Sequence, residues 1–221
     1  SYHEPIAVIG IACRFPGANT PEAYWELLHN GIDMVSEVPA VRWDVDAYYD
    51  PVPATPGKTY TREAAFLADV NQFDPYFFGI SPREAVDMDP QHRLLLEVSW
   101  EALERAGQAP ANLVDSQTGV YIGISPSDYR TLMDEQSQFD VYSSTGNSPI
   151  FASGRLAYIL GLQGPNLVID TACSASLIGV HLACESLRNG TSDLALAGGV
   201  RIALSAQRQV AMAQMQALAP D

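Results

Sequence analysis

The sequence predicts an α/β protein in which a mixed or parallel sheet is covered by helices on both faces. Apolar runs at Pro5 to Ala12, Gly119 to Ser125 and Leu167 to Ile169, followed by the region Asp193 to Leu204, have the composition of buried strands. Segments with a helical pattern and clear caps separate these runs. This alternation is typical of sheets that are buried on both faces. With 221 residues, 47% of them hydrophobic, the chain is long enough to bury a sizeable core.

The first third of the chain predicts one strand, one helix and a long irregular excursion. Pro5 to Ala12 is expected to be a buried first strand. Thr20 is a helix cap with Pro21 at the first helical position, and Gly31 is expected to stop that helix. From Asp33 to about Asp69 the sequence has little hydrophobic periodicity and contains many prolines and aromatic residues. In a compact domain such an excursion is more often a functional lid or interface than a plain connector.

Helix starts in the middle of the chain are marked by residue pairs. Ser81-Pro82 begins a short helical piece, and Asp89-Pro90 begins a longer helix that Gly107 ends. A further helix is expected from about Pro149 to Leu160. The apolar face of the longer helix is predicted to consist of Leu94, Leu95, Val98, Ala102 and Leu103.

The most informative stretch runs from Asn166 to Gly190. A short buried strand, Leu167 to Ile169, leads into a helix whose pattern begins at Leu177 and closes at Leu187, Arg188, Asn189 and Gly190. The following strand region, Asp193 to Leu204, is interrupted by Gly198-Gly199.

Cys173 lies at this strand-to-helix junction among small residues, namely Thr171, Ala172, Ser174, Ala175 and Ser176. Small neighbours let a substrate approach the sulfur and let the backbone turn sharply, as in the elbow that presents a serine in some hydrolases. The first amides and the positive end of the helix favour a thiolate, which is the reactive form. We therefore predict that Cys173 is a nucleophile.

The alternative for any cysteine is that it is a small buried apolar residue. Cys13, in an apolar run, and Cys184, inside the helix that follows Cys173, fit that alternative. Cys173 differs from them because strand end, helix start and small neighbours coincide there.

Composition excludes several classes of function. A net charge of −14 and a pI near 4.5 argue against nucleic acid and anionic membranes as partners. No apolar run is long enough to span a bilayer, and the chain does not open with a signal-peptide pattern. Three scattered cysteines make neither a disulfide framework nor a metal-ligand spacing, which suits a reducing cytoplasm.

Several long motifs then carry a resemblance. EPIAVIGIACRFPGA, DPQHRLLLEVSWEALERAG, GNSPIFASGRLAYILGLQGPNLVIDTACSASL and LAGGVRIAL, in this order, resemble the ketosynthase domain of modular type I polyketide synthases. The likeness runs from about Glu4 to Asp221. It implies the thiolase-like fold, an α/β fold, and specifically the N-terminal half of its duplicated layered α/β/α/β/α architecture, with inserted irregular loops. Residues 1–221 are accordingly expected to be a β-ketoacyl synthase N-terminal region without the C-terminal half.

The resemblance implies a role for Cys173. The family carries an acyl thioester on the cysteine of a DTACSSSL-type motif, which reads DTACSASL here, with Ala175 in place of one serine. Cys173 would accept an acyl chain, and a malonyl-type extender on an acyl carrier protein would lose carbon dioxide and attack it. The backbone amide of Cys173 would also be an oxyanion donor. No cofactor or metal bound by the chain is implied, because the substrates are carried on phosphopantetheine.

The histidines do not complete such a site. Family members use two histidines later in the chain, whereas His3, His29, His92 and His181 lie in no matching motif. His181 follows Cys173 by eight residues on the same helix, about 12 Å along its axis and too far for a dyad. His92 is interpreted as a surface or capping residue. We expect the 221-residue chain alone to be inactive in condensation.

Partners follow from the same resemblance. An acyl carrier protein is expected, together with an adjacent acyltransferase domain and a homodimer formed through the strand around Leu167 to Thr171. Because carrier proteins are usually acidic, docking needs a local arginine patch. The candidates are Arg14, Arg42, Arg62, Arg83, Arg130, Arg155, Arg188, Arg201 and Arg208.

Two alternatives of other classes stay open at this point. One is a non-condensing thiolase-like protein that only shapes a partner's tunnel, although such relatives commonly lack the cysteine. The other is a cysteine hydrolase with an elbow nucleophile, for which the sequence offers no clearly placed general base.

Overall fold

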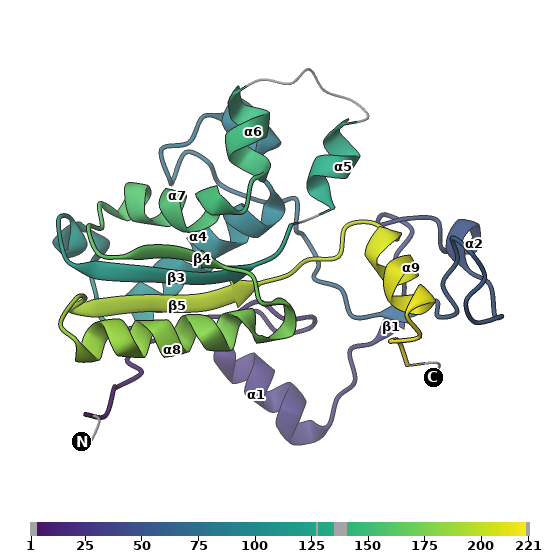
Figure 1. Ribbon diagram of the computed structural model, residues 1–221, viewed down its shortest axis with the longest axis horizontal. Helices are drawn as coiled ribbons and strands as arrows, with labels where there is room; N and C mark the ends of the chain where they lie inside the picture. The colour runs from purple at the N-terminus through teal and green to yellow at the C-terminus, as the bar shows by residue number, and fades with distance from the viewer. Residues whose placement is uncertain (1–3, 127, 135–140, 220–221) are drawn as a thin grey trace. The chain divides into compact units, whose positions relative to one another are not determined.

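The computed structural model describes residues 4–126, 128–134 and 141–219, which fall into two compact units (Figure 1). The first unit contains Val70–Pro126 and Phe139–Arg201 together with the N-terminal thirteen residues; the second contains Arg14–Asp69, Ser127–Gln138 and Ile202–Asp221. In the first unit lie α3 (Pro82–Asp87), α4 (Pro90–Arg105), η1 (Pro110–Leu113), β3 (Thr118–Ile124), α6 (Val141–Asn147), α7 (Ile150–Leu160), β4 (Asn166–Ile169), η2 (Ala172–Ser174), α8 (Ala175–Arg188) and β5 (Leu194–Val200).

The sheet of the first unit is parallel throughout its described strands. Its order is β4-β3-β5, so that β3 lies in the centre and pairs in parallel with both neighbours. Gly123 of β3 is opposite Ile169 of β4 on one side and Gly199 of β5 on the other. Of the predicted mixed or parallel arrangements, these strands adopt the parallel one.

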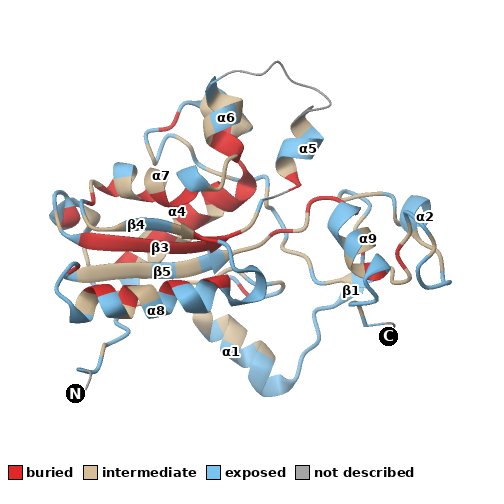
Figure 2. Cartoon of the chain, in the orientation of Figure 1, coloured by how far each residue is buried: buried red, intermediate tan, exposed pale blue. Residues whose placement is uncertain are grey.

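Helices lie on both faces of this sheet, as the sequence predicts. In Figure 1, α7 and α4 lie on one side of the strands and α8 lies on the other. Figure 2 shows β3 fully buried, while β5 is partly exposed. The prediction that β4 is buried is wrong for most of its length: Leu167 is exposed and only Ile169 is buried. Among the described strands, β4 lies at the edge of the sheet and pairs only with β3.

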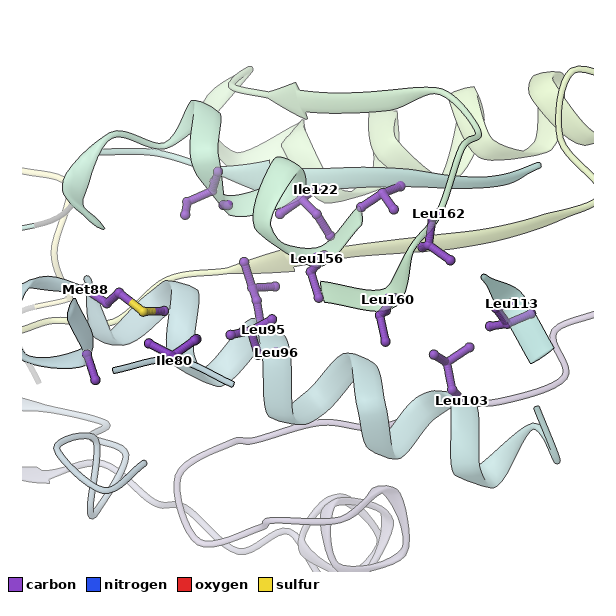
Figure 3. Close-up of a cluster of buried hydrophobic side chains, with 14 residues drawn as sticks. Ile80, Met88, Leu95, Leu96, Leu103, Leu113, Ile122, Leu156, Leu160 and Leu162 are labelled. Carbon is purple, nitrogen blue, oxygen red and sulfur yellow. The ribbon is translucent and has the colours of Figure 1, made fainter. Parts of the chain in front are cut away.

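The main core fills the space between the sheet and α4 and α7 (Figure 3). Its labelled members include Leu95, Leu96 and Leu103 of α4, Leu156 and Leu160 of α7, and Ile122 of β3. The predicted apolar face of α4 is therefore only partly correct. Leu95 and Leu103 are buried, but Leu94, Val98 and Ala102 are half-buried, and the buried stripe includes His92, Leu96 and Ser99 instead.

The predicted first strand is wrong, because Pro5 to Ala12 adopts no regular secondary structure. Val8, Ile9 and Ile11 are 77%, 49% and 57% exposed. A strand needs a hydrogen-bonding neighbour as well as an apolar pattern, and among the described residues none pairs with this segment.

The predicted helix starts are confirmed. Thr20 accepts a hydrogen bond from Ala23 N at the start of α1 (Pro21–Asn30), and Gly31 ends that helix at φ +61°. Ser81 caps α3 in the same way, and Asp89 caps α4 by accepting from Gln91 N at 2.8 Å. These ends are correct because caps are local signals that need no tertiary partner.

The second unit contains α1 and the excursion from Asp33 to Asp69, which is irregular as expected. It holds only two-residue strands, β1 (Ser36–Glu37) and β2 (Glu63–Ala64), which pair antiparallel, and the single-turn α2 (Val45–Tyr48). Within the same unit lie α5 (Tyr129–Asp134) and α9 (Gln207–Gln214). Tyr60 closes this unit by donating its hydroxyl to the carbonyl of Leu218 at 2.6 Å.

Candidate functional site

Cys173 lies in η2, between the end of β4 and the start of α8. It is exposed, whereas Cys13 and Cys184 are half-buried. The alternative that Cys173 is a buried apolar residue is therefore wrong.

The backbone turns sharply immediately before the cysteine. Ala172 has φ +55°, a left-handed conformation that residues with a Cβ seldom adopt. The amide of Ala172 donates to Asp170 Oδ1 at 3.2 Å, and the hydroxyl of Ser125 donates to the same oxygen at 2.8 Å. One carboxylate thus connects the end of β3, the end of β4 and the turn that presents Cys173.

The amino end of α8 approaches the sheet through two glycines. A Cβ at Gly123 would lie 2.7 Å from Ser176 N, and one at Gly199 would lie 2.8 Å from Ser176 Cβ. The glycines thus let the helix start lie directly on β3 and β5. The expected interruption at Gly198-Gly199 is wrong, because β5 continues through both residues. Gly199 serves close packing rather than a break.

The start of α8 favours negative charge. Its N-cap, Ser174, turns its hydroxyl backward, within 3.0 Å of Thr171 O and 2.9 Å of Thr171 Oγ1, rather than onto the first amides of the helix. No acidic residue lies in the first turn. The Ser174 side chain therefore does not cap the first amides of α8, which lie at the positive end of the helix dipole.

The described histidines lie on helices, and none of them forms a hydrogen bond with Cys173. His29 lies in the last turn of α1 and His181 on α8, both exposed. His3 lies outside the described residues. No group of three His, Cys, Asp or Glu side chains within the described ranges could hold a metal ion.

The interpretation of His92 as a surface or capping residue is wrong. It is only 2% exposed, and within the described part of the chain neither ring nitrogen has a hydrogen-bond partner. Burial, and to a smaller extent the charge of Arg155, lowers the pKa of His92 to about 4. Asp89, not His92, caps the helix. All four residues of the first turn of α4, Pro90 to Arg93, are buried. Three of them are polar, so the apolar pattern of the later turns does not predict their burial.

Most of the candidate arginines are engaged within their own unit. They form ion pairs or hydrogen bonds with the following groups: Arg14 with Asn19 O, Arg42 with Leu67 O, Arg62 with Glu37 and Asp46, Arg155 with Glu84, Arg188 with Glu185, and Arg201 with Pro126 O. Arg83 lies over the ring of Tyr142. Arg130 on α5 and Arg208 on α9 are exposed.

Two parts of this site are not predicted from the sequence. Asp170 belongs to the DTACSASL motif but receives no role from it, and Ser125 is predicted only as the end of a strand. Their partnership depends on β3 and β4 being neighbours in register, which a single sequence does not state. The partnership could have been inferred because Ser125 and Asp170 each directly follow a predicted strand. The carboxyl ends of parallel strands lie at the same edge of a sheet, so residues that follow them can meet.

The family of the chain follows from its match to a known protein family. The description "Beta-ketoacyl synthase, N-terminal domain" matches residues 3–221. The chain belongs to the β-ketoacyl synthase family. Similar proteins include a phenolphthiocerol/phthiocerol polyketide synthase of Mycobacterium tuberculosis, 52% identical over 98% of this chain and 12% of that protein. Polyketide synthase GfsB of Streptomyces halstedii is 53% identical over 99% of this chain and 4% of its own length.

Solved ketosynthases have the same fold. The oxazolomycin ketosynthase domain OzmH KS7 of Streptomyces albus superposes with a TM-score of 0.90 at 37% identity, over 97% of this chain and 38% of that one. The ketosynthase from module 6 of the bacillaene synthase of Bacillus subtilis gives a TM-score of 0.86 at 39% identity, over 97% and 35%. The thiolase-like α/β fold is thereby confirmed. The β-ketoacyl synthase chain described here spans only a small part of its curated relatives.

No helix in the described ranges is both long and apolar enough to cross a membrane.

Proposed function

We propose that Cys173 accepts the acyl chain in a polyketide-forming condensation. The observation that carries this proposal is an exposed cysteine at a strand-to-helix elbow, in a chain of the β-ketoacyl synthase family. The short helix η2, which contains Cys173, directly precedes α8, whose first amides are proposed to hold the oxyanion of a thioester under attack. One of the similar bacillaene ketosynthase structures is a cysteine-to-serine mutant.

The loading step is a thioester exchange. The thiolate of Cys173 attacks the acyl carbonyl and forms a new carbon–sulfur bond. The carbon–sulfur bond to phosphopantetheine breaks, and phosphopantetheine leaves as a thiolate that takes up a proton from water. The backbone amide of Cys173 is proposed as one oxyanion donor. The chain itself holds no cofactor in this scheme, because the acyl group arrives on the arm of an acyl carrier protein.

Condensation is proposed to need further catalytic groups besides Cys173. A malonyl-type extender loses carbon dioxide, and its carbanion attacks the acyl carbonyl. The carbon–sulfur bond to Cys173 then breaks, Cys173 leaves as the thiolate, and the β-ketoacyl thioester remains on the carrier. His29 and His181 are exposed on helices, and His92 is buried and uncharged at neutral pH. We therefore expect the 221-residue chain alone to form acyl-Cys173 at most and to release no β-ketoacyl product.

The proposed partners are an acyl carrier protein, an adjacent acyltransferase domain and a second copy of the chain. The edge position of β4, with Leu167 42% exposed, supports dimerisation through this strand. The candidate arginines that are exposed, Arg83, Arg130, Arg188 and Arg208, are the docking candidates to substitute first. Three free cysteines suit the proposed location in a reducing cytoplasm.

Incubation with a mass-tagged acyl thioester tests the proposal. We expect one stable acyl group on the peptide containing Cys173, lost in Cys173→Ser and retained in Cys184→Ala, which alters the half-buried cysteine of the same region. Turnover to free acid would favour the cysteine hydrolase instead. No acyl group on Cys173 would favour the non-condensing thiolase-like protein.

A further inference from the structure

Asp170 occupies a position that connects three elements at the cysteine. It follows β4 directly, and Ser125 follows β3 directly, so the two residues leave neighbouring parallel strands at the same edge of the sheet. The hydroxyl of Ser125 donates to Asp170 Oδ1 at 2.8 Å. The end of the central strand is thus joined by a side chain to the segment that leads to Cys173.

The same oxygen also holds the turn. The amide of Ala172 donates to Asp170 Oδ1 at 3.2 Å, and Ala172 is the residue with φ +55°. A left-handed conformation is unfavourable for a residue with a Cβ, so it persists only where the surroundings hold it. The hydrogen bond to Asp170 is a direct restraint of this kind, one residue before the sulfur.

We propose that Asp170 is a positioning residue, which fixes the elbow so that Cys173 is held at the amino end of α8. The proposal rests on the proposed function of Cys173. Asp170 acts through Ala172 and does not touch the substrate. Ser125 supports it by holding the carboxylate in the orientation that receives the amide.

If Asp170 acted through its charge alone, its removal would change the reactivity of Cys173 in the opposite direction. A carboxylate near a thiolate disfavours the thiolate, so removing its charge should make the cysteine more reactive. A role through hydrogen bonding depends on the oxygen acceptor, which asparagine retains and alanine lacks. Asp170→Asn and Asp170→Ala therefore separate the two roles.

The experiment compares the wild-type protein with Asp170→Asn, Asp170→Ala and Ser125→Ala. Each is treated with iodoacetamide and, separately, with a mass-tagged acyl thioester, and the rate at each cysteine is followed by peptide mass. We expect both rates at Cys173 to fall about tenfold in Asp170→Ala and about threefold in Ser125→Ala, because a small misplacement of a reacting group is costly. Asp170→Asn should stay within about twofold of the wild type, since it keeps the acceptor.

The labelling of Cys13 and Cys184 is the internal control, and it should be the same in every variant. Equal rates at Cys173 in all four proteins would overturn the positioning role, and so would faster reaction in both Asp170 variants. Should Asp170→Ala fail to fold, Ser125→Ala and Asp170→Asn still decide between the outcomes.

Failure of the proposed function gives a different result. In that case the thioester labels Cys173 in none of the proteins, including the wild type. The iodoacetamide rates, which require no acyl transfer, then still report whether Asp170 positions the sulfur.

Discussion

The central strand β3 and the segment 5–13 share a four-residue pattern in different surroundings. Residues 121–124 read Tyr-Ile-Gly-Ile and residues 8–11 read Val-Ile-Gly-Ile. In β3, Ile122 and Ile124 are 2% and 1% exposed, whereas Ile9 and Ile11 are about half exposed. β3 has a parallel strand on each side, and the N-terminal segment has no strand partner among the described residues.

The difference shows what an apolar pattern can and cannot specify. The pattern states that a segment is able to be a buried strand. Only hydrogen-bonding neighbours make it one, because an isolated extended segment leaves its backbone groups to water. Paired substitutions at corresponding positions in the two segments measure this difference directly.

The largest difference is expected for the first isoleucine of the pattern. Ile122→Ala removes a side chain packed between the sheet and α4 and α7, and should lower the free energy of unfolding by about 4 kcal/mol. Ile9→Ala, at a half-exposed site, should lower it by about 0.5 kcal/mol. Urea denaturation followed by circular dichroism measures both. Similar losses in the two variants would contradict the assignment of Ile9 to an unpaired segment.

Local signals explain which elements the sequence could specify. Thr20 and Asp89 start their helices because a cap bonds to amides only two or three residues away. Gly31 ends α1 for an equally local reason, its left-handed conformation. The junction at Cys173 was also predictable, since strand end, small residues and helix start follow one another along the chain.

Features that depend on neighbouring elements escaped prediction. The pairing of Asp170 with Ser125 joins residues 45 positions apart in sequence. The burial of His92 depends on α4 packing against other helices, and periodicity alone indicates a different face. The prediction for Pro5 to Ala12 fails for the same reason, because an apolar pattern carries no information about a partner strand.

Acidification should lower the stability of the packed region around α4, because His92 is buried there. Its pKa is lowered to about 4 by burial and by Arg155, whereas in the unfolded chain it has the ordinary value of 6.5. Between these values the unfolded state binds a proton that the folded state does not, so stability is lost as pH falls from about 6.5 to about 4. The contribution is at most about 3 kcal/mol.

The acidic residues also titrate near the lower end of this range, so the test is a difference between variants. Urea denaturation at several pH values should show a shallower loss in His92→Gln than in the wild type. His29→Gln, which alters an exposed histidine, is the control and should follow the wild type. Parallel curves for His92→Gln and the wild type would contradict this, because they would show that the pKa of His92 is the same in the folded and unfolded states.

The smallest difference in unfolding free energy between the two segments is expected for substitutions of the glycine of the pattern. A Cβ at Gly123 would lie 2.7 Å from Ser176 N and 2.8 Å from Ala175 C, both backbone atoms at the start of α8. Since β3 and α8 are both fixed by packing, Gly123→Ala should cost about 2 kcal/mol. It should also slow labelling of Cys173 by iodoacetamide, because the helix start has to shift. Gly198→Ala, where a Cβ meets nothing within 4 Å, is the matched control in the same sheet.

Gly10 is the glycine at the corresponding position of the N-terminal segment, and Gly10→Ala is the counterpart of Gly123→Ala. Its Cβ would lie 2.3 Å from Ala102 O, so the N-terminal segment lies close to α4 at Gly10. Because the segment has no strand hydrogen bonds to break, it can move away, and we expect a loss of about 0.5 kcal/mol with unchanged labelling of Cys173. A loss as large as that of Gly123→Ala would mean that contact with α4, rather than strand pairing, is what anchors residues 5–13.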